Sequence, residues 1–212
     1  MKKILLVGDS IRIGYDKYVK AALEDVAEVY YPDTNCRFTV YLFRHLPDWK
    51  QNFCNNEDVD VIYWNAGLWD NLVMADGQCL LPIEIYEYYI ERICKSIQIL
   101  FPKAKMIFAT STAVIEATDP KLQKRQNENT MKYNAAAAKI VESYGGQVDD
   151  LFALTKDAPE SYHSDPTHFY TPEGTELLSD HVVKTLEKAL SIQGKKVDYK
   201  QLFTEAQNVI GE

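Results

Sequence analysis

The feature that most constrains the fold is a regular alternation of short apolar runs with longer segments of helical periodicity. The apolar runs, which we expect to be strands, lie at Lys3–Gly8, Ala27–Tyr31, Val59–Trp64, Lys105–Ala109 and Gln147–Phe152. Short apolar strands separated by helices are typical of a parallel sheet that is covered by helices on both faces. The sequence therefore predicts an α/β fold, with a five-stranded parallel sheet inside a three-layer α/β/α sandwich.

The segments between these strands predict helices of unequal clarity. Clear periodicity marks the residues after the first strand (Tyr15, Tyr18, Val19, Ala22 and Leu23 on one face), Pro82–Leu100, Asn129–Tyr144 and the stretch from Pro172 to about Ile192. Thr171 suits the N-cap of that last helix. A weaker helix is expected over Phe38–Phe53, with a break at Pro47 because proline removes a backbone donor. A small extra helix is expected at Tyr199–Val209.

Length and composition indicate one globular domain. The chain has 212 residues, of which 46% are hydrophobic and 25% charged, and neither a repeat nor a linker divides it. We expect a single domain over residues 1–212, with a core at about 3–192 and a polar C-terminal extension at 193–212. The net charge of −8 disfavours partners with many phosphates, so nucleic acid and anionic membrane surfaces are not expected.

A cytoplasmic location is expected. The apolar stretch Ile4–Val7 is shorter than the roughly 7–15 residues of a secretory signal core. No stretch approaches the ~18 apolar residues of a membrane span. The four cysteines, Cys36, Cys54, Cys79 and Cys94, show neither CxxC spacing nor a nearby histidine, so we expect free thiols and no metal site.

Polar residues follow the predicted strands where a ligand would bind. Open parallel sheets bind ligands beyond the carboxyl ends of their strands, which places Ser10, Asn65, Thr110-Ser111 and the loop around Asp165 along one rim. Ser10 lies between the first strand and the first helix, where a helix N-terminus favours developing negative charge. A serine at this position becomes a nucleophile only if a base lies beside it.

The candidate base is His168, in the loop before the last helix. Asp165 precedes it by three residues, so in a turn its carboxylate could accept the Nδ1–H and leave Nε2 facing Ser10. Either motif alone is weak, because serine and aspartate also cap helices and Asp165 could form an Asx turn. His163 lacks an aspartate at this spacing, and His45 and His181 are expected to be structural.

Together, Gly8-Asp9-Ser10 at the end of strand one and DxxH before the last helix resemble the SGNH, or GDSL-type, hydrolases. Gly174 also fits the final block of that family. The resemblance implies a flavodoxin-like sheet, with Ser10 as nucleophile, His168 as general base and then acid, and Asp165 as the orienting carboxylate. It further implies a carboxylesterase that works through an acyl-serine, with neither metal nor organic cofactor.

Two blocks depart from the family pattern. After strand two the family offers a glycine N–H to the oxyanion hole, but this chain has no glycine there, so the amide of Cys36 or Arg37 is expected to donate. After strand three, Trp69 stands where the family has asparagine. Asn65 is therefore expected to supply the side-chain donor, whereas Asp9 and Asp70 are expected to hold loops.

The substrate is expected to be a small-molecule ester. Aromatic residues of the predicted rim could stack on sugars or line an acyl pocket: Trp64, Trp69, Tyr162, Phe169 and Tyr170. The N-x-G-L-W-D pattern resembles family members that act on small acyl groups, which suggests acetyl esters on carbohydrates. A ligand-binding module that has lost the activity and an acyltransferase remain as alternatives, and the sequence leaves the oligomeric state open.

Overall fold

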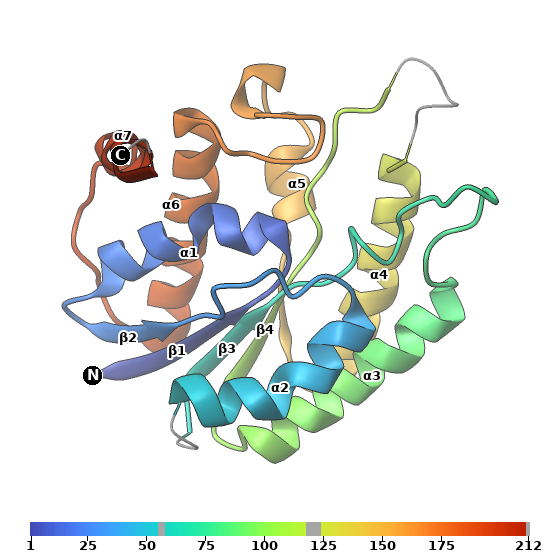
Figure 1. The fold of residues 1–212 in the computed structure, drawn as a ribbon. Coiled ribbons are helices and arrows are strands. Elements are labelled where there is room, and N and C mark those ends of the chain that lie inside the picture. Colours follow the sequence, from blue (N-terminus) through green and yellow to red (C-terminus); the bar gives the residue numbers. More distant parts are fainter. Residues whose placement is uncertain (55–57, 118–123, 211–212) are drawn as a thin grey trace.

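A five-stranded parallel sheet forms the centre of the molecule (Figure 1). The computed structural model describes residues 1–54, 58–117 and 124–210. The strands are β1 (Lys2–Val7), β2 (Ala27–Tyr30), β3 (Val61–Trp64), β4 (Lys105–Ala109) and β5 (Gln147–Asp149). Their order is β2-β1-β3-β4-β5, and all neighbours run parallel. The predicted fold class is confirmed.

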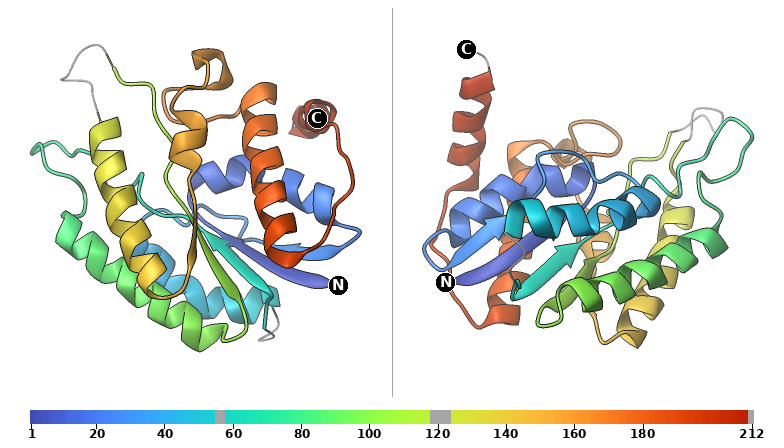
Figure 2. Two further views of the ribbon diagram at one scale, coloured as in Figure 1. Left: turned by 180° about the vertical axis from the view of Figure 1, so that it is seen from behind. Right: turned by 60° about the horizontal axis from the view of Figure 1, so that its bottom comes forward.

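Helices cover both faces of the sheet (Figure 2). They are α1 (Ser10–Leu23), α2 (Thr39–Cys54), α3 (Ile83–Leu100), α4 (Asn127–Ser143), α5 (Leu151–Thr155), the 3₁₀ turn η2 (Glu160–Tyr162), α6 (Pro172–Leu190) and α7 (Tyr199–Ile210). Alternate residues of β1 point to opposite faces, so Ile4 and Leu6 pack against α1 and α6, while Leu5 and Val7 pack against α2, α3 and α4. Both faces are therefore buried.

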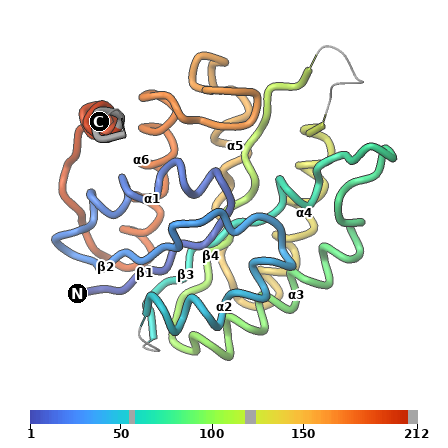
Figure 3. Tube along the Cα trace, viewed as in Figure 1, coloured from blue at the N-terminus to red at the C-terminus, as the bar shows by residue number. Residues whose placement is uncertain are grey.

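The strand order creates the position for a site. β1 has β2 on one side and β3 on the other, so the order of the strands reverses at β1 and leaves a crevice beyond the ends of β1 and β3. Ser10 follows β1 and Asn65 follows β3, which places both at this switch point. The N-terminus and α7 lie at the β2 side of the sheet (Figure 3). In α7, Tyr199 belongs to the same buried cluster as α1 and α6.

Two expected boundaries are wrong. The expected strand Gln147–Phe152 ends at Asp149, because the carboxylate of Asp150 accepts a hydrogen bond from the Ala153 amide (3.0 Å) and starts α5 instead. The helix α2 continues through Pro47, where a break was expected. Its buried residues Leu42, Leu46 and Trp49 lie on both sides of the proline, and their packing offsets the single backbone bond that proline cannot make.

No helix of the described residues is long and apolar enough to cross a membrane.

Candidate active site

Ser10, His168 and Asp165 lie in one hydrogen-bonded row. The distance from Ser10 Oγ to His168 Nε2 is 2.8 Å, and the distance from His168 Nδ1 to Asp165 Oδ2 is 2.7 Å. The amides of Thr167 (2.8 Å) and His168 (3.1 Å) both donate to Asp165 Oδ1. These two bonds orient the carboxylate, so that its other oxygen faces the imidazole.

The charge of Asp165 determines how the protons are placed. Partial burial disfavours the charged carboxylate, but hydrogen bonds from the Thr167 amide and from His168 outweigh it and hold the pKa of Asp165 below its usual range. An ionised Asp165 can only accept, so Nδ1 of a neutral His168 must carry the proton. Nε2 then accepts the hydrogen bond from the hydroxyl of Ser10, which is the arrangement that a general base requires.

Asp9 connects the turn after β1 to the end of β3. Its Oδ1 accepts the amide of Ile11 (2.9 Å), which caps α1, and also accepts Nδ2 of Asn65 (2.9 Å). The side chain is fully buried, and this burial raises the pKa of Asp9. Gly8 permits the close approach, because a Cβ there would lie 1.8 Å from Oδ1 of Asn65. Asp9 thus holds the turn, as expected, and it also orients Asn65.

The expected backbone donors after β2 are both engaged elsewhere, and that expectation is wrong. The Cys36 amide donates to the carbonyl of Gly8 (3.0 Å), and the Arg37 amide donates to Oδ1 of Asn35 (2.7 Å). Arg37 has a φ of 52°, a conformation that glycine adopts more easily. Among the described residues, no group accepts a hydrogen bond from the Ser10 amide. The second Nδ2 hydrogen of Asn65 also has no acceptor among them. Both groups are therefore left as donors at the turn after β1 and at the end of β3.

Asp70 has a structural role, as expected. Its Oδ1 accepts both the amide (3.0 Å) and the hydroxyl (2.6 Å) of Thr39, which ties the loop after β3 to the start of α2. Burial raises the pKa of Asp70 to about 6, against the effect of these two hydrogen bonds.

Only some of the expected rim aromatics are available to a ligand. Trp64 and Phe169 are buried in the core, because they follow the inward-facing pattern of their segments, so these two expectations are wrong. Trp69, Tyr162 and Tyr170 are half-buried. The Tyr170 hydroxyl donates to the carbonyl of Ser10, and its ring stacks on the imidazole of His168 with centroids 4.8 Å apart. Tyr170 therefore contacts two members of the row.

Sequence reasoning missed a buried arginine beneath the site. The guanidinium of Arg12 pairs with Asp16 and donates to the carbonyls of Pro32 (2.8 Å) and Thr34 (2.7 Å). It thereby attaches the loop after β2 to α1. The sequence does contain a signal for this contact: Arg12 and Asp16 form a charged pair at i and i+4 on a helix face that is otherwise apolar.

Histidines 45 and 181 lie outside the row, as expected. His45 Nδ1 is 3.1 Å from Oδ2 of Asp48, and His181 Nε2 is 2.6 Å from Oδ1 of Asp149. The other oxygen of Asp149 accepts the hydroxyl of the buried Tyr63 (2.8 Å). The hydrogen bond to Asp149 raises the pKa of His181 despite partial burial.

This pair predicts a pH-dependent contribution to stability. Because the pKa of His181 is higher in the folded state, its bond to Asp149 contributes fully below about pH 6.5, the unperturbed value, and the contribution is lost as pH rises through the folded pKa. We expect His181→Gln to lower the free energy of unfolding more at pH 5.5 than at pH 9. Urea unfolding of both proteins at the two pH values measures this, and an equal penalty at both would contradict it.

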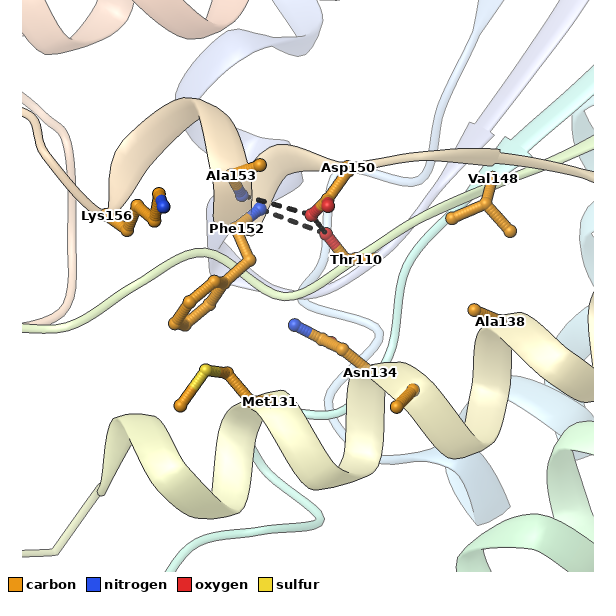
Figure 4. Close-up of a pocket in the computed structure, with 10 residues that line it drawn as sticks. Thr110, Met131, Asn134, Ala138, Val148, Asp150, Phe152, Ala153 and Lys156 are labelled. Carbon is orange, nitrogen blue, oxygen red and sulfur yellow. Dashed lines mark hydrogen bonds between the residues drawn. The ribbon is translucent and has the colours of Figure 1, made fainter.

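A cavity of about 370 Å³ lies between α4 and α5, away from the row (Figure 4). Its polar residues hold the start of α5: Thr110 Oγ1 donates to Asp150 Oδ1 (3.0 Å) and accepts the Phe152 amide (3.0 Å). The expected rim residue Ser111 is likewise held, because its amide donates to Oδ1 of Asn134 (2.8 Å). In the described ranges, no group of three His, Cys, Asp or Glu side chains could hold a metal ion.

Solved structures share this architecture, although the sequences have diverged. No protein-family model and no curated protein matches the sequence. The acetyl xylan esterase AlAXEase superposes with a TM-score of 0.69 at 19% identity, over 87% of this chain and 99% of that one. A lipase/acylhydrolase from Enterococcus faecalis gives 0.69 at 18% identity, over 93% and 100%. A catalytic mutant of the acetylxylan esterase Axe2 from Geobacillus stearothermophilus gives 0.68 at 14% identity, over 92% and 97%. The chain therefore has the fold of these esterases and GDSL-like lipases.

Proposed function

We propose that the chain is a serine esterase of the SGNH hydrolase family that cleaves small acyl esters, acetyl esters of carbohydrates in particular. The observation that carries the proposal is the row from Ser10 Oγ through His168 to Asp165, with distances of 2.8 and 2.7 Å. Support for the substrate class comes from similar structures, two of which are acetyl xylan esterases.

In the proposed mechanism, Ser10 Oγ attacks the ester carbonyl carbon while His168 Nε2 takes the hydroxyl proton. The carbonyl oxygen becomes an oxyanion, which the Ser10 amide and Asn65 Nδ2 stabilise. When this intermediate collapses, the alcohol leaves with the proton from Nε2, and an acyl-serine remains. Water then attacks the acyl carbon and gives its proton to Nε2, which returns it to Ser10 as the carboxylate departs. Asp165 stays ionised throughout and stabilises the imidazolium.

The test is hydrolysis of p-nitrophenyl esters of increasing acyl length, with Ser10→Ala measured in parallel. We expect the acetyl ester to be cleaved with the highest kcat/KM, and Ser10→Ala to show no turnover above the uncatalysed rate. An acetylated xylo-oligosaccharide, followed by release of acetate, tests the carbohydrate part. If the wild-type chain and Ser10→Ala turn over equally slowly, the chain is a ligand-binding module on this fold.

The role of Asn65 gives a separate prediction. If its amide stabilises the oxyanion, Asn65→Ala should lower kcat by about 10²–10³-fold, with little change in KM, because the bond forms only in the transition state. Asn71→Ala is the matched control, since Asn71 is also a buried amide, bonded to Thr130 Oγ1 (3.2 Å). An Asn65→Ala enzyme with the kcat of the control would remove Asn65 from the mechanism.

Location and domain organisation complete the proposal. The four cysteines, all in the described part of the chain, form no disulfide, which supports a reducing compartment such as the cytoplasm. The single sheet, buried on both faces, supports one domain over residues 1–212.

A further inference from the structure

Arg125 lies between the two loops that flank the candidate site. Its Nε donates to the carbonyl of Leu68 (3.1 Å), in the loop that follows β3 and Asn65. Arg125 also lines a cavity of about 280 Å³ together with Pro166 and Thr167, the two residues between Asp165 and His168. The half-buried guanidinium therefore lies beside the loop that carries Asp165 and His168.

This guanidinium has no anionic partner among the residues that the structure describes. Burial lowers the pKa of Arg125, against the attraction of Asp9 and Asp165, so both carboxylates lie within its electrostatic range. Neither of them accepts a hydrogen bond from it. Both oxygens of Asp165 are bonded within its own loop, and the bonded oxygen of Asp9 serves Ile11 and Asn65.

Two further charged groups line the cavity. Lys124 adds a second cation, and Glu116 is the one carboxylate among its described lining residues. Glu116 is engaged at the start of α4, where its Oε1 accepts the Asn127 amide (2.5 Å). Among the described lining residues, two cations therefore stand against one carboxylate, in a protein whose net charge is −8.

A partly desolvated guanidinium that donates to no described carboxylate keeps hydrogen-bond donors for the anionic group of a ligand. The planar fork of arginine matches the geometry of a carboxylate. We propose that Arg125 binds a carboxylate of the substrate, and that the enzyme prefers esters whose alcohol part carries this group, such as acetylated sugar acids. The alcohol part is favoured because His168 protonates the departing alcohol, and the cavity borders the loop of His168. This inference rests on the proposed esterase function and specifies its substrate class.

A matched pair of acetyl esters tests the proposal: 3-acetoxybenzoate, which carries a carboxylate on the alcohol part, and its neutral methyl ester. The readout is the ratio of the two kcat/KM values, so any general loss of activity in a variant cancels. Because a hydrogen bond to a charged group is strong, we expect Arg125→Gln to lower this ratio by about tenfold or more. Arg125→Lys keeps the charge without the fork and should give an intermediate ratio.

Arg44→Gln is the matched control, because it removes one positive charge from an exposed arginine of α2 that pairs with Asp48. It should keep the wild-type ratio. An unchanged ratio in both Arg125 variants would overturn the inference and leave the esterase function intact. If instead the wild-type chain cleaves neither ester faster than Ser10→Ala, the proposed function itself fails, and the inference fails with it.

Discussion

His168→Gln is expected to lower kcat by between about 10⁴- and 10⁶-fold, the scale seen when a serine hydrolase loses its base. Among the described residues, Nε2 of His168 is the group that accepts a hydrogen bond from the Ser10 hydroxyl, and the distance from Nε2 to Oγ is 2.8 Å. Without it the hydroxyl keeps its proton, and the departing alcohol has no acid to protonate it. The measurement is steady-state hydrolysis of p-nitrophenyl acetate by enzyme purified from a strain that lacks background esterase.

His163→Gln is the matched control for this variant. His163 lies five residues earlier on the same loop, and its ring packs against the buried ring of Phe169, with centroids 3.9 Å apart. Burial lowers the pKa of His163. We expect this variant to keep activity close to that of the wild type. Comparable losses in the two variants would mean that the loop, rather than the imidazole of His168, is what the activity requires.

Asp165→Asn is expected to lower kcat by about 10³–10⁴-fold, because it should place the imidazole proton on the wrong nitrogen. The amides of Thr167 and His168 both donate to Oδ1, so the asparagine oxygen should stay on that side. The Nδ2 group then faces His168 Nδ1 and donates to it. A neutral imidazole in this state carries its proton on Nε2, where it cannot accept the proton of Ser10.

Comparison with Asp165→Ala isolates this effect. Alanine also removes the carboxylate, but it leaves the imidazole free to adopt either tautomer. The account therefore expects Asp165→Ala to be more active than Asp165→Asn at neutral pH. The opposite order would mean that Asp165 acts mainly by holding its loop, since asparagine preserves the loop bonds better than alanine does.

Local sequence signals were enough to predict the sheet and the row. The central strands β1, β3 and β4 carry nearly continuous apolar runs, which is the pattern of strands buried on both faces. DxxH is a spacing that one turn can close. Ser10 and His168 are 158 positions apart in the sequence, and the rule that ligands bind at the carboxyl ends of parallel strands predicted that they meet. Asn65 was placed at the site because it directly follows such a strand.

Contacts that depend on loop conformation could not be predicted from the sequence. The amides of Cys36 and Arg37 were expected to face the site, but an Asx turn at Asn35 and a bond to Gly8 redirect them. The short helix α5 was missed because its start depends on one capping side chain, Asp150. Arg125 has no motif around it, and its position follows from the packing of two loops that are distant in sequence.

The most direct test of the central claim is covalent labelling with a fluorophosphonate, followed by intact-mass and peptide mass spectrometry. The account predicts one adduct per chain, located on Ser10, that forms at a rate at least about 10³-fold lower in His168→Gln. Full labelling of Ser10 in His168→Gln at the wild-type rate, or an active enzyme labelled at another serine, would contradict the claim that this imidazole activates this hydroxyl.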